Sequence, residues 1–251
     1  MKRVLIATAL VLASCGPTPD GANLDAGSGG DRAVTAPSNR AGYFDCLRSG
    51  GFTALSAHRG GPAAGFAENA IPTFENTLRQ APGSFLEVDI ARTADGVLVL
   101  MHDDRVERTT SGSGAVAELD MAQLLAFSLE DDDGRRVDAR VPTLREALDW
   151  ADGRTVLELD IKRGVQYEDV ISEVELAGAM GRVVFITYSV DGAARLAGLA
   201  PQAMIYTTIS SVRELDTLER RGVDLSRIVA WVGTNTPNAS LVRALAERGV
   251  E

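Results

Sequence analysis

Basic residues, cysteines, histidines and long apolar runs are all scarce in this sequence. The chain has 25 Lys and Arg against 35 Asp and Glu, and its formal net charge is -10. Because the basic residues are scattered, the sequence lacks the clustered positive charge that a nucleic-acid surface needs. With 45% hydrophobic and 24% charged residues, the composition is that of a globular protein with a sizeable core. We therefore expect no nucleic-acid partner, and no pattern indicates an oligomeric state.

The N-terminal apolar run, residues 4–12, is far too short to span a bilayer and follows two basic residues. It ends in a Leu-Ala-Ser-Cys tetrapeptide at 12–15, which resembles a bacterial lipobox. The resemblance implies a signal peptide at 1–14, cleavage before Cys15 and lipid modification of its thiol, which would anchor the chain to a membrane. An ordinary signal peptide with an incidental cysteine is the alternative.

The residue after that cysteine is Gly16, as in lipoproteins sent to an outer membrane. We therefore expect an exported bacterial lipoprotein of the cell envelope, on the periplasmic side of the outer membrane or at the cell surface. Only Cys46 would remain as a free thiol, so no intramolecular disulfide is expected. Residues 15–40 are rich in Gly, Pro, Ser, Asp and Asn and predict a flexible tether.

From residue 41 to 251, short apolar runs alternate with segments of helical period, which predicts βα units around a parallel sheet. The expected strands are 53–58, 85–91, 97–102, 155–161, 182–188, 203–209 and 227–233. The expected helices are 71–80, 121–125, 143–151, 168–180, 192–199, 211–221 and 238–248. This order favours the α/β class and a TIM-type (β/α) barrel.

The number of expected strands is seven, one fewer than a complete barrel has. The sequence ends at residues 249–251, directly after the seventh helix, where an eighth strand would be expected to begin. We therefore expect a barrel domain at 41–251 that lacks its eighth strand and is incomplete at its C-terminus. The alternative is a barrel that closes in some unusual way.

Chemically active residue types follow several of these runs. Both histidines do so directly, His58 after 53–57 and His102 after 97–101. Glu87 and Asp89 are two positions apart on one strand, so their carboxylates share a face and would repel each other unless a cation lay between them. Oxygen ligands favour Ca²⁺ or Mg²⁺ over zinc. The alternative is that backbone amides or Arg92 bind these carboxylates.

Six segments in a fixed order resemble the glycerophosphodiester phosphodiesterase family, whose barrel is of the phospholipase C-like kind. The similarity covers residues 57–114 most densely, and the strand 157–162 to a lesser degree. The segments are Ala-His-Arg-Gly-Gly at 57–61, Glu-Asn-Ala-Ile-Pro-Thr-Phe at 68–74, Phe-Leu-Glu-Val-Asp-Ile at 85–90, Thr-Ala-Asp-Gly at 93–96, Val-Leu-Met-His-Asp at 99–103 and Arg-Thr-Thr-Ser-Gly at 108–112.

The resemblance implies a metal held by Glu87, Asp89 and a third carboxylate. The family has Glu at the third position, two residues before a Lys, and here Asp160 precedes Lys162. Glu158 lies one alternation earlier, as a fallback ligand or a buried partner of Lys162.

Arg59 and Lys162 would bind the phosphate, and His58 and His102 would serve as acid and base. Glu68 and Asn69 match the family's Pro-Glu-Asn, with Ala in place of Pro. The resemblance suggests that Glu68 contacts the metal's surroundings or Arg59. Helix capping is the alternative role for Asn69.

The activity implied is metal-dependent hydrolysis of a glycerophosphodiester to an alcohol and sn-glycerol 3-phosphate. Which histidine is the acid stays open, as does direct attack by water against a cyclic phosphate intermediate. One alternative is a phosphodiesterase acting on phospholipid or sphingolipid head groups with the same barrel. Another is a surface lipoprotein that binds its ligand without catalysis.

Overall fold

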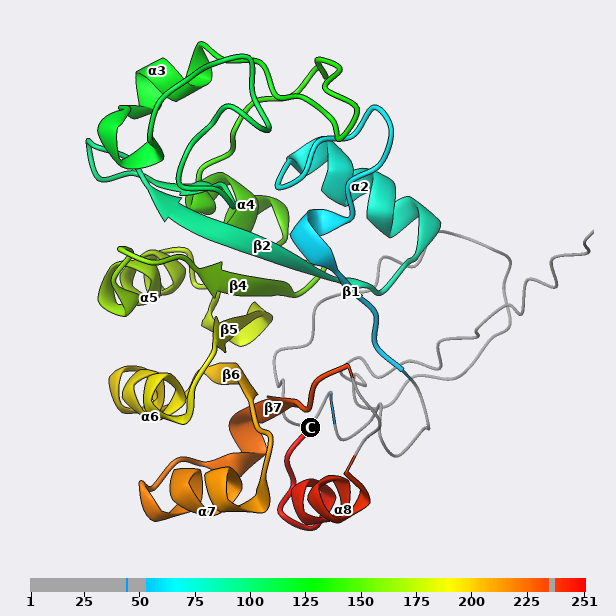
Figure 1. Cartoon of the computed structure of the whole chain (residues 1–251), viewed down its shortest axis with the longest axis vertical. Coiled ribbons are helices and arrows are strands. Elements are labelled where there is room, and N and C mark those ends of the chain that lie inside the picture. Colours follow the sequence, from blue (N-terminus) through cyan, green and yellow to red (C-terminus); the bar gives the residue numbers. More distant parts are fainter. Residues whose placement is uncertain (1–43, 45–52, 235–237) are drawn as a thin grey trace, which may run out of the picture.

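The computed structural model describes residue 44, residues 53–234 and residues 238–251. The expected signal peptide, Cys15, the tether and Cys46 lie outside the described residues. Figure 1 shows a curled sheet with helices along its outer side, so that the strands form a half-barrel. The expected α/β barrel class is confirmed.

Six parallel strands make the half-barrel, in the order β1-β2-β4-β5-β6-β7. Their bounds are β1 Ser56–Ala57, β2 Phe85–Arg92, β4 Leu157–Ile161, β5 Val183–Thr187, β6 Met204–Thr208 and β7 Ile228–Trp231. Two backbone bonds connect β7 to Glu251, whose N–H donates to Ile228 O while its O accepts from Ala230 N–H. The carboxyl ends of the parallel strands meet along one edge, which is where barrels carry their sites.

Every helix expected from the sequence is present within a few residues. The helices are α2 Ile71–Gln80, α3 Met121–Leu125, α4 Leu144–Trp150, α5 Tyr167–Leu176, α6 Val190–Leu199, α7 Val212–Arg220 and α8 Ala239–Glu247. Four short 3₁₀ helices lie in the connections: η1 His58–Gly60, η2 Val116–Glu118, η3 Met180–Arg182 and η4 Leu225–Arg227. Side-chain caps fix several starts; Thr143 and Glu146, for example, form a capping box on α4. Among the described residues, no helix has the length and apolar content to cross a membrane.

The segment 97–102 differs from its expectation as a barrel strand. It contributes β3 (Leu98–Leu100), which pairs antiparallel with β2 and lies off the parallel order. The reason is a tight turn at 93–97, where Thr93 N–H donates to Val97 O and Gly96 has a φ of 87°. The described half-barrel therefore has six parallel strands, and β3 runs antiparallel beside β2.

The chain from β3 to α4 forms an excursion drawn above the sheet in Figure 1. A second apolar cluster lies there, and it also includes Ala67, Ala70 and Ala91. Val106, Leu124 and Leu129 are almost fully buried in this cluster. The main core lies between the sheet and the outer helices and includes Leu86, Val88 and Ile90 of β2. Since side chains alternate along a strand, the intervening Glu87 and Asp89 face the inside of the half-barrel.

Candidate functional site

Three carboxylates meet at the carboxyl ends of β2 and β4. Parallel pairing sets Asp89 beside Asp160, and Glu87 lies one alternation before Asp89. One oxygen from each of these three residues lies within 4.8 Å of the others. Glu87 is 8% exposed, Asp89 1% and Asp160 3%. The structure thus brings together the metal ligands that the sequence predicted; we call Glu87, Asp89 and Asp160 the acidic centre.

The electrostatics of the acidic centre fit a bound cation. Burial, and then the nearby charge of Asp89, raise the pKa of Glu87 to about 8. Asp160 Oδ1 is buried and has no hydrogen-bond partner among the described residues. Buried oxygens without donors are costly, and a hard divalent ion would satisfy them.

Among the described residues Arg92 pairs with neither Glu87 nor Asp89, and its Nε lies 3.9 Å from Asp169 Oδ2. A backbone amide does bind Glu87, as the alternative expected, because the Arg59 N–H donates to its Oε2.

Lys162 and Tyr188 contact the acidic centre directly. Lys162 Nζ lies 2.7 Å from Asp89 Oδ1 and 2.5 Å from Asp160 Oδ2. Burial alone would lower the pKa of Lys162, but these contacts raise it above its ordinary value, so the ammonium stays charged. The Tyr188 hydroxyl donates to Asp160 Oδ2 at 2.7 Å. Phosphate binding by Lys162 stays a prediction.

Glu158 takes neither of the roles expected of it. Its carboxylate accepts a hydrogen bond from Ser56 Oγ, and it is not among the three residues that could share a cation. Lys162 bonds to Asp160 instead. The physical reason is its position on β4. Glu158 comes two residues before Asp160, so it lies about 6–7 Å further from the strand end.

A strained turn after β1 brings His58 to this edge. Arg59 has a φ of 51°, in the left-handed region that side chains rarely adopt. A Cβ on Gly60 would lie 2.2 Å from the Phe74 ring, so only glycine fits there. In this conformation the backbone N–H of Arg59 donates to Glu87 Oε2 at 2.7 Å. His58 is exposed beside it, and its ring has no hydrogen-bond partner among the residues described.

Asn69 holds Asp89 and does not cap a helix. Its Nδ2 donates to Asp89 Oδ2 at 2.7 Å, and its Oδ1 accepts from the Asp89 backbone N–H at 3.1 Å. The N-cap of α2 is Ala70, which makes no side-chain capping bond. The capping interpretation is therefore wrong, because the φ of 56° at Asn69 turns its amide toward β2.

Glu68 lies at the centre of an ion-pair network that reaches His102. It accepts from Arg59 at 2.8 Å and from both terminal nitrogens of Arg108 at 2.9 and 2.7 Å. Arg108 Nε also donates to Asp103 Oδ2 at 2.6 Å, and Asp103 Oδ1 lies 2.6 Å from His102 Nδ1. The expected contact of Glu68 with Arg59 is present. The network holds the Nδ1 edge of the His102 ring through Asp103. The Nε2 atom has no partner in the described chain.

The arginines keep both carboxylates of the network ionised. The bonds from Arg108, and then the contact with His102, lower the pKa of Asp103 to about 2. Burial alone would raise the pKa of Glu68, but the bonds from Arg108 and Arg59 lower it below its ordinary 4.5.

We expect Glu68→Gln to lower the free energy of unfolding by about 1–3 kcal/mol at pH 7, because two guanidinium groups lose their shared carboxylate. A lowered folded-state pKa gives stability that is complete above the ordinary value and is lost as pH falls through the folded value. The difference between the two proteins should therefore be full above pH 4.5 and shrink at lower pH. Urea unfolding across this range measures it, and a difference that grows on acidification would contradict the assignment.

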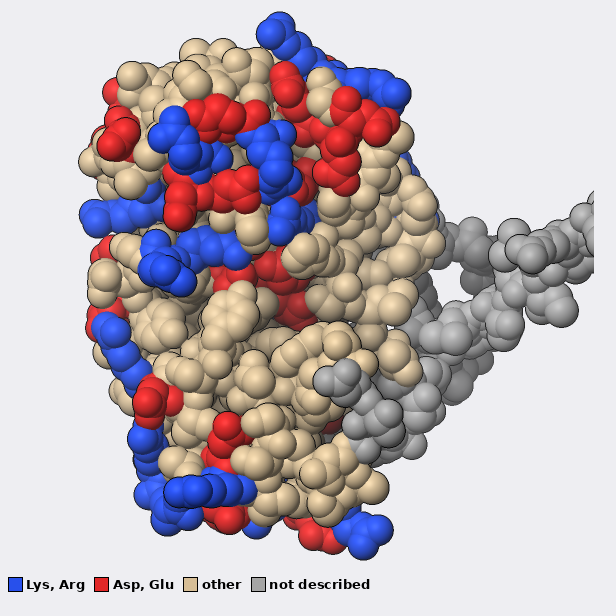
Figure 2. Space-filling model, viewed as in Figure 1, with Lys and Arg blue, Asp and Glu red and all other residues tan. Residues whose placement is uncertain are grey.

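His102 approaches the acidic centre from β3. The N–H of Met101 donates to Asp89 O at 2.9 Å, so His102 follows directly on a residue bonded to β2. The structure thus sets both histidines in segments tied to the acidic centre: His58 adjoins Arg59, and His102 adjoins Met101. Figure 2 shows acidic side chains exposed at the middle of this face, below a region of mixed charge.

Sequence reasoning assigned no role to Asp103, Arg108 or Tyr188. The first two fall inside segments that resemble the family, so the resemblance was a signal that they matter. Tyr188 follows β5 and had no such signal; only the position of β5 beside β4 relates it to Asp160.

The fold and the acidic centre define a (β/α)-barrel protein with a carboxylate site at its strand ends. Residues 58–251 match the model of the glycerophosphoryl diester phosphodiesterase family. The chain belongs to this family. A crystal structure of a glycerophosphoryl diester phosphodiesterase from Parabacteroides distasonis is 36% identical with a TM-score of 0.74, covering 78% of this chain and 69% of that one.

Two further relatives match part of this chain. The uncharacterized protein YqiK of Bacillus subtilis is 32% identical over 59% of this chain and 63% of its own length. Glycerophosphodiester phosphodiesterase 1 of Rattus norvegicus is 36% identical over 45% of this chain and 34% of its own length. The chain thus spans less than two thirds of the length of these relatives.

Proposed function

We propose that this protein hydrolyses glycerophosphodiesters to an alcohol and sn-glycerol 3-phosphate in a metal-dependent reaction. The observation that carries the proposal is the buried acidic centre at the strand ends of a chain in this family. The Lys162 ammonium offsets only part of the repulsion among these three carboxylates, and a divalent cation would offset the remainder.

The ion would be Ca²⁺ or Mg²⁺, held by Glu87, Asp89 and Asp160, because all three donors are hard oxygens. When bound, such an ion polarises a phosphoryl oxygen and offsets the negative charge that develops there. Asn69 and Tyr188 orient two of these carboxylates through the hydrogen bonds described above.

Phosphodiester cleavage needs positive charge for the phosphate and a proton carrier on each side of the phosphorus. Arg59 and Lys162 supply the positive charge beside the acidic centre. One of His58 and His102 would take a proton from the attacking nucleophile, water or a glycerol hydroxyl, while the other gives one to the departing alkoxide. Asp103 holds Nδ1 of His102, which leaves Nε2 to exchange the proton.

The test is an assay of the purified chain on glycerophosphoinositol and glycerophosphocholine with added Ca²⁺ or Mg²⁺, with and without a chelator. We expect release of glycerol 3-phosphate from at least one diester, abolished by the chelator and restored by excess metal. Turnover of intact phospholipid in place of soluble diesters would favour a lipid head-group phosphodiesterase. Binding without turnover of either would favour a non-catalytic surface protein.

We also propose that the chain is an exported lipoprotein of the cell envelope, because its residues 12–15 resemble a lipobox. In a bacterial host the full chain should fractionate with membranes, and Cys15→Ser should fractionate with soluble or unprocessed protein. Cys46→Ser serves as the matched control and should stay with the membranes. Equal fractionation of both variants would contradict the anchor.

A further inference from the structure

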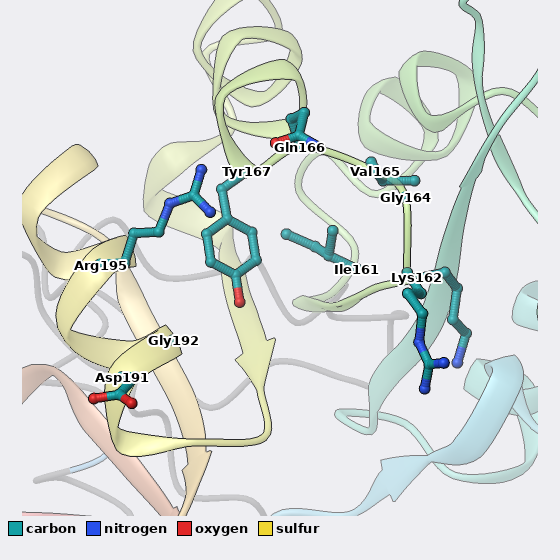
Figure 3. Close-up of a pocket in the computed structure, with 10 residues that line it drawn as sticks. Ile161, Lys162, Gly164, Val165, Gln166, Tyr167, Asp191, Gly192 and Arg195 are labelled. Atoms are coloured by element: carbon teal, nitrogen blue, oxygen red, sulfur yellow. The ribbon is translucent and has the colours of Figure 1, made fainter.

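A cavity of about 400 Å³ lies between the loop after β4 and the start of α6, and Lys162 is one of its lining residues. Figure 3 shows Tyr167 and Arg195 on one side of it and Lys162 on the other, with Asp191 at the start of α6. The remaining lining residues are Ile161, Arg163, Gly164, Val165, Gln166 and Gly192. Its size is within the usual range for a small-molecule site.

Lys162 belongs to both this cavity and the acidic centre. Its Nζ contacts Asp89 and Asp160, while the same residue lines the cavity. A phosphodiester carries two ester substituents on one phosphorus. A substrate with its phosphorus at the acidic centre could therefore extend one substituent past Lys162 into this cavity.

The cavity is poorly suited to a cationic head group. A trimethylammonium group needs an open aromatic face or a free carboxylate. The Tyr167 ring is covered by the Arg195 guanidinium, 5.3 Å from the ring centroid. Asp191 is paired with Arg221 at 2.5 Å, and Glu168 is paired with Arg195 at 3.0 Å.

The cavity does suit an alcohol with several hydroxyl groups. Arg163 offers N–H donors and Gln166 offers both a donor and an acceptor, and neither side chain has a hydrogen-bond partner among the described residues. Arg195 bonds to Glu168 through one terminal nitrogen and keeps its other N–H groups for a ligand. Hydroxyls both donate and accept, so an uncharged polyol can use this mixed set without bringing a positive charge toward the arginines.

We propose that this cavity is the subsite for the alcohol part of the substrate and that it selects a polyol over choline, with Arg195 as the specificity-determining residue. The proposal rests on the proposed diesterase function. Arg195 acts by covering the Tyr167 ring, which is the aromatic face in the lining that a quaternary ammonium would need. Its pair with Glu168, which lies outside the lining, holds the guanidinium in that place.

The experiment compares kcat/KM for glycerophosphoinositol and glycerophosphocholine. Wild-type protein is expected to prefer the inositol diester by about tenfold. Arg195→Ala uncovers the ring, so the preference should fall by at least about fivefold, mainly through a lower KM for the choline diester. Arg195→Lys keeps the positive charge and should keep the wild-type preference.

Arg145→Ala is the matched control, because Arg145 is also a half-exposed helical arginine bonded to a carboxylate, Asp149. It lies outside the cavity lining and should leave the preference unchanged. An equal preference in wild-type protein, or an unchanged preference in Arg195→Ala, overturns the subsite while leaving the diesterase function in place. Absence of turnover of both diesters overturns the diesterase function, and the subsite with it.

Discussion

Replacing His102 with alanine is expected to lower kcat by about 10²–10⁴-fold, which is the usual contribution of a general acid or base. The ring is one-third exposed, and its described hydrogen bond is to Asp103. The free energy of unfolding should therefore change by less than about 1 kcal/mol, as expected for a surface side chain. His58→Ala is expected to behave alike, because His58 is exposed and contributes little packing.

Steady-state kinetics and urea unfolding measure both quantities in the same preparations. Asp104→Ala is the matched control, since Asp104 is an exposed neighbour of the His102–Asp103 pair and has no part in the network. Near wild-type kcat in either histidine variant would exclude the scheme in which two histidines carry protons on opposite sides of the phosphorus.

Asp160→Asn and Asp89→Asn are expected to weaken binding of Ca²⁺ or Mg²⁺ by more than about 100-fold, because each removes a charged ligand from the acidic centre. Calorimetric titration with the metal alone measures the affinity without relying on turnover. Asp160→Glu should retain binding, since the family has glutamate at this position.

Glu158→Gln is the matched control for these variants. It alters a buried carboxylate on the same face of the same strand, but one that bonds to Ser56 and lies outside the acidic centre. Its metal affinity should stay within about threefold of wild type, a change worth less than about 1 kcal/mol. Equal losses in Glu158→Gln and Asp160→Asn would show that the cation lies deeper in the half-barrel than proposed.

Local patterns predicted the elements and the acidic centre well. The two-residue spacing of Glu87 and Asp89 fixed their common face, and the resemblance supplied Asp160 as the third ligand. Helical periodicity located every helix to within a few residues; Ser211, expected as the first residue of its helix, is the N-cap of α7 and accepts from Glu214 N–H. The common face and the helix starts depend on neighbours within a few positions, which is why sequence alone contains them. Asp160 is distant in sequence, and only the resemblance related it to Glu87 and Asp89.

Features that depend on distant contacts were missed or wrong. Arg108 bonds to Glu68 across 40 positions, and no periodicity in either segment indicates that contact. Asn69 was ambiguous, because an asparagine before a helix usually caps it. The apolar run at 97–102 was expected to be a barrel strand, since an antiparallel strand and a parallel one can have the same apolar composition.

The residues proposed for catalysis lie in two regions that pack around different apolar clusters. His102 and Asp103 belong to the excursion, whereas the acidic centre belongs to the sheet and its outer helices. Regions with their own small cores open more readily than the whole domain does. Opening of the excursion alone would displace His102 while leaving the three carboxylates together. Substitutions in this second cluster should therefore lower kcat more than they lower cation affinity.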